Sequence, residues 1–341
     1  MNDAVSGRRI DPGLERDARA LIDDLVLVNG LDASDFGDVL LDSLSAGRVG
    51  ACLVSSTRNG VGLMSGQTSP HHQYLRDRAD RIALATTVAE IEGIRRAGKI
   101  AIVFGLQVAD MLEENLERLT VLHALGLRSC GLAYNVGNYI GSGCTELDPG
   151  PLSRFGVGFV EALQSLRIAV DIGGHCSEAT SFDALRHTRG PVVCTHTTAR
   201  ALRNTPRAMS DELLRAIADR GGVVGIAAFS FFLVPSGRGT VDDFVDHLDY
   251  VARLIGPQHV GLGLDFILGK EYRGPVTDTD MFTAEAYPQQ FDDWVYPEGL
   301  SDFRGLERVV AGLLARRHSQ EAIAAMMGGN WLRVWREIWG A

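Results

Sequence analysis

The sequence has no long uninterrupted apolar run. None of its segments approaches the roughly 18 consecutive apolar residues that a membrane-spanning helix needs. Residues 1–20 have no apolar core of the kind that secretory signal peptides carry, and the last residues, WREIWGA, form no hydrophobic anchor tail. We therefore expect a cytoplasmic protein without a membrane partner.

Cysteine, positive charge and nucleotide-binding motifs are scarce or missing. The five cysteines are an odd number without a CxxC pair, which predicts reduced thiols rather than a disulfide scaffold. Thirty-three Lys and Arg residues stand against 43 Asp and Glu residues, and a formal net charge of −10 should repel nucleic acid. The glycine-rich stretches match neither GxGxxG after a first strand nor GxxxxGK[ST], so nucleotide binding has no support.

Short apolar runs, in contrast, recur along the chain. Each is rich in Val, Ile and Leu and is bounded by glycine or polar residues, as strands of a fully buried parallel sheet are. Segments with apolar residues at helical spacing lie between them, for example 80–97, 110–125, 153–165, 210–220 and 241–255. The predicted strands are residues 25–31, 49–55, 99–107, 127–135, 167–173, 191–196, 222–229 and 259–266.

This alternation predicts an α/β protein with a (β/α)8 barrel, the TIM barrel, rather than an open doubly wound sheet. Further helical segments at 12–24, 303–316, 320–327 and 331–339 should pad the barrel. We expect one domain over 1–341, with an amino-terminal helical extension at 1–24 and carboxy-terminal helices at 301–341. Residues 267–300 follow the eighth strand without a clear period and suit a lid or substrate wall.

Polar residues stand at the ends of most predicted strands, where barrel enzymes build their active sites. His175 and His196 follow neighbouring strands, and a neutral imidazole is the commonest protein ligand for zinc. Asp265, or an oxygen ligand from another strand, can complete a site for one metal ion whose open position holds a reactive water. The strand-end residues are Asp32, Gln107, Tyr134, Asn135, Asp171, His175, His196 and Asp265.

Each of these residues also has a structural interpretation. A lone histidine is more often a hydrogen-bonded scaffold residue than a metal ligand. Two histidines at successive barrel strands have this structural role less often. Asp265 can pin a loop, or it can face a ligand that the glycines of VGLGLDF allow to approach the backbone. Arg207 and Arg200 can clamp a substrate carboxylate, although most arginines after a strand are solvated.

Several long motifs resemble the renal (membrane) dipeptidase family of zinc peptidases, family M19, whose members are TIM barrels with a two-metal site. These motifs are GLAYNVGN, GSGCTELDPGPLSRFG, VDIGGHCSEATSFDAL, PVVCTHTTARALRNTPRAMSDE and VDHLDYVARLIGPQHVGLGLDF. The resemblance implies that His175 and His196 bind zinc, that Arg207 grips the substrate carboxylate and that Asp265 lies beside the reacting water. It also implies a homodimer.

Other functional positions of the family are changed in this chain. Leu31 and Ala33 stand where the family has the His-x-Asp ligands of its first zinc, Gln107 replaces its bridging glutamate, and Tyr134 replaces its substrate-binding histidine. A neutral amide cannot hold two cations together by charge, so we expect at most one zinc ion. An extra residue before His175 is expected to displace its imidazole.

These residues predict a metal-dependent amidohydrolase acting on a small dipeptide-like substrate. In this hypothesis His175 and His196 bind the metal, Asp265 is the general base, Tyr134 or Gln107 polarises the carbonyl, and Arg207 and Asn135 bind the substrate. An alternative is a non-peptidase of the same fold, such as an isomerase, lyase or tailoring enzyme in small-molecule biosynthesis, which works with or without metal. A third is a catalytically silent protein that binds a carboxylate ligand through Arg207.

Overall fold

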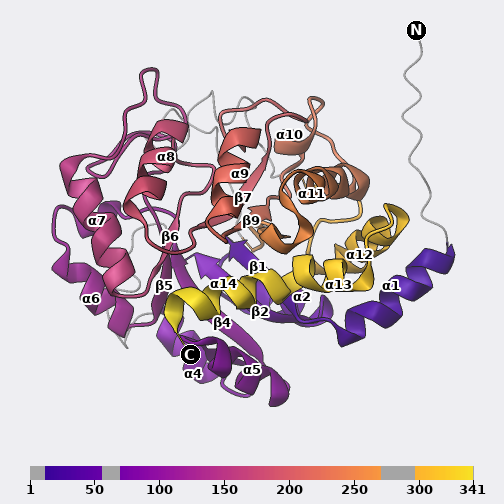
Figure 1. The fold of residues 1–341 in the computed structure, drawn as a ribbon. Helices are drawn as coiled ribbons and strands as arrows, with labels where there is room; N and C mark the ends of the chain where they lie inside the picture. Colours follow the sequence, from indigo (N-terminus) through magenta and orange to yellow (C-terminus); the bar gives the residue numbers. More distant parts are fainter. Residues whose placement is uncertain (1–11, 56–69, 270–295, 341) are drawn as a thin grey trace, which may run out of the picture.

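The computed structural model of the chain describes residues 12–55, 70–269 and 296–340. Within these ranges eight parallel strands close into a barrel, because β2 pairs with β4 at one end of the strand order and β1 pairs with β10 and β2 (Figure 1). The barrel strands are β1 (Leu27–Asp32), β2 (Val49–Ser55), β4 (Ile100–Leu106), β5 (Leu127–Gly131), β6 (Ala169–Asp171), β7 (Val193–Ala199), β9 (Val223–Ile226) and β10 (Val260–Leu262).

The predicted (β/α)8 barrel is confirmed, and its eight strands fall within or overlap the eight predicted runs. Two short strands were not predicted. β3 (Ile82–Leu84) pairs with the start of β4, and β8 (Ala208–Met209) pairs with the end of β7. Most barrel residues are fully buried because side chains fill the interior and helices cover the outside, which explains why the strands are nearly continuous apolar runs.

Helices follow most strands and surround the barrel, as Figure 1 shows. The described helices are α1 (Pro12–Asp24), α2 (Asp38–Ala46), α4 (Pro70–Asp77), α5 (Val88–Arg96), α6 (Glu117–Ala124), α7 (Arg154–Ser165), α8 (Glu178–His187), α9 (Asp211–Asp219), α10 (Ser230–Leu233), α11 (Val241–Ile255), α12 (Leu306–Ala315), α13 (Gln320–Ala324) and α14 (Asn330–Trp339).

Capping residues explain where several helices begin. Ser153, Ser177 and Ser210 accept a hydrogen bond from a backbone N–H in the first turn of α7, α8 and α9. The predicted helix 80–97 is wrong in its first part, where β3 lies. Thr87 and Glu90 form a capping box that starts α5 only at Val88.

Other helix predictions need smaller corrections. The predicted helix 110–125 is a 3₁₀ turn (Asp110–Leu112) followed by α6, with Glu113 between them at a φ of 49°. The sequence interpretation gave no bounds for α2, α8 or α10. The predicted lid at 267–300 lies mostly outside the described residues.

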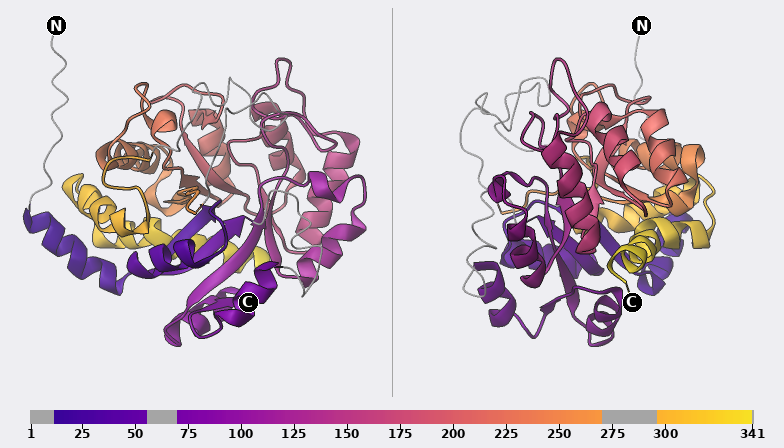
Figure 2. Two further views of the ribbon diagram at one scale, coloured as in Figure 1. Left: turned by 180° about the vertical axis from the view of Figure 1, so that it is seen from behind. Right: turned by 60° about the vertical axis from the view of Figure 1, so that its left-hand side comes forward.

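The terminal helices pack on the barrel and on each other. Figures 1 and 2 show α1 beside α12, and these helices are in contact. α14 packs against the amino ends of several strands, and Trp331 reaches the last residue of β10, where its Nε1 donates to the carbonyl of Leu262 at 2.9 Å. A Cβ at Gly30 or Gly261 would collide with the Trp331 ring, so these glycines admit the indole. In the described part of the chain, no helix has the length and apolarity that crossing a membrane requires.

Candidate active site

Two buried imidazoles meet at the carboxyl ends of β6 and β7. The rings of His175 and His196 are 4.8 Å apart between centroids, and their Nε2 atoms are 2.9 Å apart. Both side chains are almost inaccessible to solvent, at 3% and 1% exposure. The expected displacement of His175 is therefore wrong, since the loop 172–174 returns its ring to His196.

Asp171 at the end of β6 shapes this loop. Its Oδ1 accepts backbone N–H groups from Gly173 and Thr195, both at 2.9 Å, and so ties the loop to β7. A Cβ at Gly174 would lie 2.7 Å from Nη1 of Arg207, so the close approach of this arginine requires glycine there.

β7 is irregular at the second histidine. Its register with β9 shifts between Cys194 and Thr197, which indicates a bulge that brings the side chains of both Thr195 and His196 into the site. A Cβ at Gly225 or Gly263 would collide with the carbonyl oxygen of Thr195. Of the two glycines before Asp265, Gly263 therefore accommodates the backbone of β7 and Gly261 accommodates the Trp331 ring, whereas the sequence interpretation assigned both to a ligand.

Hydrogen-bond partners define which ring nitrogens carry protons. His175 Nδ1 lies 2.8 Å from Asn135 Oδ1, which can only accept, so this nitrogen donates. Thr195 Oγ1 donates its only proton to Asp171 Oδ2 at 2.5 Å, so it accepts from His196 Nδ1 at 2.8 Å. In the neutral form of each ring, the proton is on Nδ1 and the Nε2 lone pair faces the other ring.

Both histidines are neutral at physiological pH. Burial lowers the pKa of His175 well below its ordinary value, and the charge of Arg207 and the neighbouring His196 lower it further. Burial and Arg207 likewise hold the pKa of His196 well below its ordinary value. A neutral imidazole with an unprotonated Nε2 is the form in which histidine binds a metal through that nitrogen.

Two oxygen atoms complete the cluster. Gln107 donates from Nε2 to Ser55 Oγ at 3.1 Å, which turns its Oε1 toward His175 Nε2, also at 3.1 Å. Asp265 Oδ2 lies 4.0 Å from His196 Nε2. Four lone-pair donors thus converge, although among the described residues no group of three or more His, Cys, Asp or Glu side chains is arranged to hold a metal ion.

Tyr134 and Asn135 frame the histidine pair. The ring of Tyr134 stacks on His175 with 3.6 Å between centroids and an interplanar angle of 22°. Asn135 has a φ of 60°, in the left-handed region, and its Oδ1 holds the His175 ring. Asp265 also has a positive φ of 55°, so two site residues share this uncommon backbone conformation.

Arg207 supplies the positive charge of the site. Its side chain is only 2% exposed, and its guanidinium carbon lies 5.2 Å from the centroid of the Phe232 ring. Burial is the main cause that lowers the pKa of both histidines, and the charge of Arg207 lowers these pKa values further. A buried guanidinium is a strong binding group for a carboxylate.

All seven residues that we predicted for the site are brought together by the fold, and their roles stay predictions. Asp32, which the sequence also placed at a strand end, uses its Oδ1 to accept the backbone N–H of Ser34 at 2.9 Å. Sequence reasoning missed Thr195 and Ser55, which orient His196 and Gln107. No motif marks either residue, because each acts through a neighbouring side chain.

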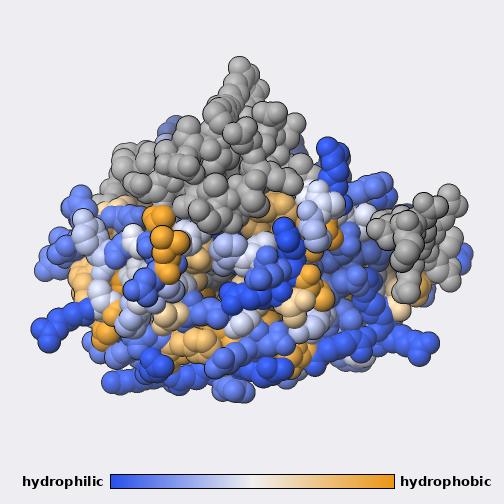
Figure 3. Space-filling model, turned by 90° about the horizontal axis from the view of Figure 1, so that it is seen from above, coloured by the Kyte–Doolittle hydropathy of each residue, from blue (hydrophilic) through white to orange (hydrophobic). Residues whose placement is uncertain are grey.

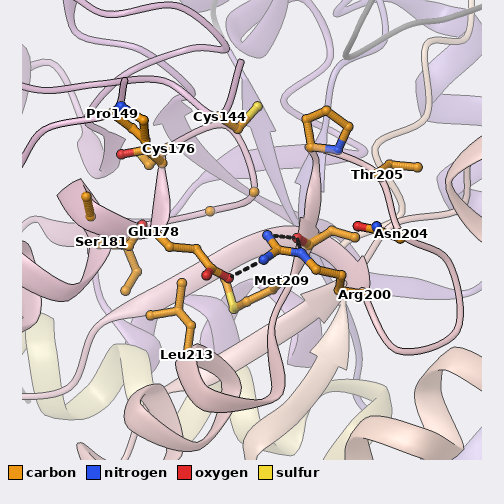
Figure 4. A pocket seen from close by; sticks show the side chains of 17 residues that line it. Cys144, Pro149, Cys176, Glu178, Ser181, Arg200, Asn204, Thr205, Met209 and Leu213 are labelled. Atoms are coloured by element: carbon orange, nitrogen blue, oxygen red, sulfur yellow. Dashed lines mark hydrogen bonds and ion pairs between the residues drawn. The ribbon is translucent and has the colours of Figure 1, made fainter. Parts of the chain in front are cut away.

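Little space lies directly against the histidine pair. The cavity lined by Gln107, His175 and His196 measures about 10 Å³, roughly what one water molecule needs. A larger cavity of about 520 Å³ shares Gly173 and Cys176 with the small one and is also lined by Arg200 (Figure 4). Arg200 pairs with Glu178 at 3.1 Å in its wall, so Arg200 belongs to this neighbouring cavity.

The surface seen from above carries interspersed hydrophilic and apolar side chains over its described part (Figure 3). Tyr139 and Leu147, in the segment between β5 and α7, are 54% and 99% exposed. Neither residue contributes to the histidine cluster.

Known proteins with similar sequences and structures identify the family and share the barrel fold. The membrane dipeptidase family (peptidase family M19) matches residues 38–281 and 289–340. An uncharacterized protein in the pqqA 5′ region of Klebsiella pneumoniae is 30% identical over 277 residues, which cover 78% of this chain and 93% of that protein. An uncharacterized dipeptidase of Schizosaccharomyces pombe is 29% identical over 72% of this chain but only 55% of its own length.

A solved structure of an amidohydrolase from Pseudomonas aeruginosa superposes with a TM-score of 0.86. It is 27% identical to this chain and covers 95% of it, and the match includes 99% of the amidohydrolase. The family match over most of the sequence and this superposition lead to one conclusion: the chain belongs to the membrane dipeptidase family, peptidase family M19, and is a dipeptidase-like amidohydrolase.

Proposed function

We propose that this protein hydrolyses the amide bond of a small dipeptide-like substrate and that it uses one zinc ion held by His175 and His196. The observation that carries the proposal is the 2.9 Å approach of two unprotonated Nε2 atoms, each fixed by an acceptor on its Nδ1. Two acceptor nitrogens repel each other at this distance unless a cation or a proton lies between them.

The residues fit a single metal ion. Zinc binds histidine nitrogen at about 2.0–2.1 Å, so two ligand nitrogens 2.9 Å apart are within the span of one ion. Gln107 Oε1 is the nearest additional oxygen donor, and it brings no charge. A bound zinc ion would supply a Lewis acid and lower the pKa of a coordinated water.

Asp265 is placed to act as the general base. Its carboxylate lies beside His196 and within the same cluster, where a substrate amide and a water molecule must meet. Its backbone has a left-handed φ of 55°, and its Oδ2 lies 4.0 Å from His196 Nε2. The water oxygen adds to the amide carbonyl carbon as Asp265 takes a proton from the water, and the C–N bond then breaks as Asp265 gives this proton to the leaving amine.

Arg207 and Tyr134 are proposed to hold the substrate. A dipeptide carries a free carboxylate, and the buried guanidinium of Arg207 provides the charge that binds it. Tyr134 covers the face of His175 and offers a phenol to the substrate carbonyl or carboxylate. Asn135 serves the site through His175, whose Nδ1 it orients.

Metal analysis combined with a dipeptide panel tests this proposal. Protein purified without chelator should contain about one zinc ion per chain and should cleave at least one dipeptide, while the His196→Gln variant should lose both properties. His318→Gln is the matched control, because His318 pairs with Asp249 on another part of the molecule. Wild-type protein that binds no zinc or manganese and cleaves no dipeptide would contradict the proposal.

One observation favours the second candidate, a non-peptidase of the same fold. Gln107 takes the place of a bridging carboxylate and is fixed by Ser55 as a neutral oxygen donor, so the site carries less negative charge than a two-metal site requires. Substrate turnover that persists after chelation, in an isomerase or lyase assay on carboxylated amides, would support this alternative. The homodimer and the cytoplasmic location stay predictions.

A further inference from the structure

We propose that Asp171, Thr195 and His196 form a one-way hydrogen-bond chain that keeps His196 in the tautomer protonated on Nδ1. These hydrogen bonds thereby point the Nε2 lone pair of His196 toward that of His175, so that both lone pairs can bind a cation. Asp171 and Thr195 are in this view positioning residues that act through His196. The proposal rests on the proposed metal site, although its test does not require the metal.

Asp171 determines which group donates and which accepts along this series of hydrogen bonds. Oδ1 already accepts two backbone N–H groups, from Gly173 and Thr195, so the carboxylate cannot rotate without breaking both bonds. Oδ2 faces Thr195 Oγ1 at 2.5 Å and, as part of an ionised carboxylate, can only accept. The threonine hydroxyl must therefore donate to Asp171.

Thr195 passes this direction on to His196. A hydroxyl has one proton to donate, and Thr195 has given it to Asp171, so its Oγ1 can only accept from His196 Nδ1 at 2.8 Å. Thr195 and His196 are adjacent in β7, and the bulge there brings the hydroxyl against the neighbouring ring. All three side chains are 3% exposed or less, so bulk water does not compete for these bonds.

Without the hydrogen bonds from Asp171 through Thr195, the two imidazoles could form a hydrogen bond with each other. A proton moved to His196 Nε2 could be donated to the lone pair of His175 Nε2, 2.9 Å away, in an ordinary hydrogen bond. Asn135 fixes His175 as the acceptor in such a pair. The chain from Asp171 opposes this arrangement and so keeps both lone pairs available.

Two substitutions should release or reverse the chain. Thr195→Val removes the hydroxyl at nearly constant volume, and His196 should move its proton to Nε2 to bond with His175. Asp171→Asn should reverse the chain, because the amide oxygen must remain with the two backbone N–H groups and the NH2 group then faces Thr195. The threonine would donate to His196 Nδ1 and force the proton onto Nε2.

Ring ¹⁵N NMR of metal-free protein at about pH 8 measures the tautomer, with the His196 signals assigned by their loss in His196→Gln. Wild type and Thr195→Ser should show His196 protonated on Nδ1, and Thr195→Val and Asp171→Asn should show it on Nε2. Thr198→Val is the matched control and should resemble wild type, because the buried Thr198 hydroxyl has no hydrogen-bond partner among the described residues. Zinc titration with a competing dye should show a loss of affinity of roughly 10- to 100-fold in both disrupting variants.

The tautomer result decides the proposal. It is overturned if wild-type His196 carries its proton on Nε2, or if both Thr195→Val and Asp171→Asn keep it on Nδ1. If Thr195→Val fails to fold, Asp171→Asn and Thr195→Ser still give opposite expected results. Wild-type protein that shows the expected tautomers but binds no zinc would overturn the proposed function and leave the hydrogen-bond chain intact.

Discussion

At the scale of single residues, the site depends on where a few protons lie. Asn135 and Thr195 accept from the Nδ1 atoms of His175 and His196, and Ser55 accepts from the amide of Gln107. The lone pairs of the two histidine Nε2 atoms and of Gln107 Oε1 thereby converge, and none of these three side chains carries a negative charge. Asp265 adds a carboxylate, with its Oδ2 4.0 Å from His196 Nε2.

The ionisation of Asp171 should appear in the stability of the protein. Burial raises the pKa of Asp171 from 3.8 to about 6 in the folded state, although Thr195 and Gly173 partly oppose this rise by hydrogen bonding. A raised pKa means that protonated Asp171 stabilises the fold below about pH 4, and that this stabilisation is lost as pH rises through 6. At about 1.4 kcal/mol per unit, the loss is roughly 3 kcal/mol.

Urea unfolding of wild type and Asp171→Asn between about pH 4 and 7 measures this effect. The difference in unfolding free energy between the two proteins should shift against wild type by roughly 3 kcal/mol across that range. Gly190→Ala removes no titratable group and adds a Cβ that meets nothing within 4 Å, so its difference from wild type should stay constant across this range. A constant difference between wild type and Asp171→Asn would contradict the raised pKa.

At the scale of elements, the bulge in β7 decides how His196 enters the site. The carbonyl oxygen of Thr195 fits against Gly225 of β9 and Gly263 after β10, where any Cβ would collide with it. The glycines in β9 and after β10 thus leave space for the bulged backbone of β7. The loop after β6 depends in the same way on Gly174, which admits Arg207.

Gly263→Ala should therefore disturb both stability and metal binding. The added methyl group must push the backbone of β7 away, at a cost of about 1–3 kcal/mol in unfolding free energy, and should move His196 from His175. Thermal unfolding and zinc titration measure the two effects. Gly190→Ala is the control, because a Cβ at Gly190 meets nothing within 4 Å, and it should leave zinc affinity unchanged. Equal zinc affinity in both variants would contradict the role of the bulge.

The elements also show how far the sequence could be interpreted. The eight barrel strands were predictable because parallel strands buried on both faces are continuous apolar runs. β3 and β8 were not, since three and two residues are too few to show a period. The site residues were predictable from strand ends and family motifs, but the contacts of Thr195 and Ser55 depend on side-chain neighbours that no sequence spacing reveals.

At the scale of the whole molecule, α14 packs across one end of the barrel, and the candidate active site lies at the other end. Trp331, Trp335 and Trp339 lie on one face of this helix and are buried against the barrel. The indole nitrogens of Trp331 and Trp339 donate to the carbonyls of Leu262 and Arg128, which ties the carboxy-terminal helix to β10 and β5.

Trp331→Ala should destabilise the whole barrel without changing the site directly. Loss of a fully buried indole costs about 3–5 kcal/mol in unfolding free energy, and the resulting cavity cannot be filled by Gly30 or Gly261. Tyr139→Ala removes an exposed aromatic ring and should change stability by less than about 0.5 kcal/mol. Denaturant unfolding measures both values, and a small loss for Trp331→Ala would show that α14 does not support the barrel.

The central claim is that His175 and His196 share one metal ion. Anomalous diffraction at the zinc absorption edge, from crystals of the protein equilibrated with zinc, tests this claim most directly. We expect one peak per chain, within about 2.1 Å of both Nε2 atoms. The absence of a peak at this position in zinc-saturated crystals, or a second peak beside it, would contradict a single-metal site.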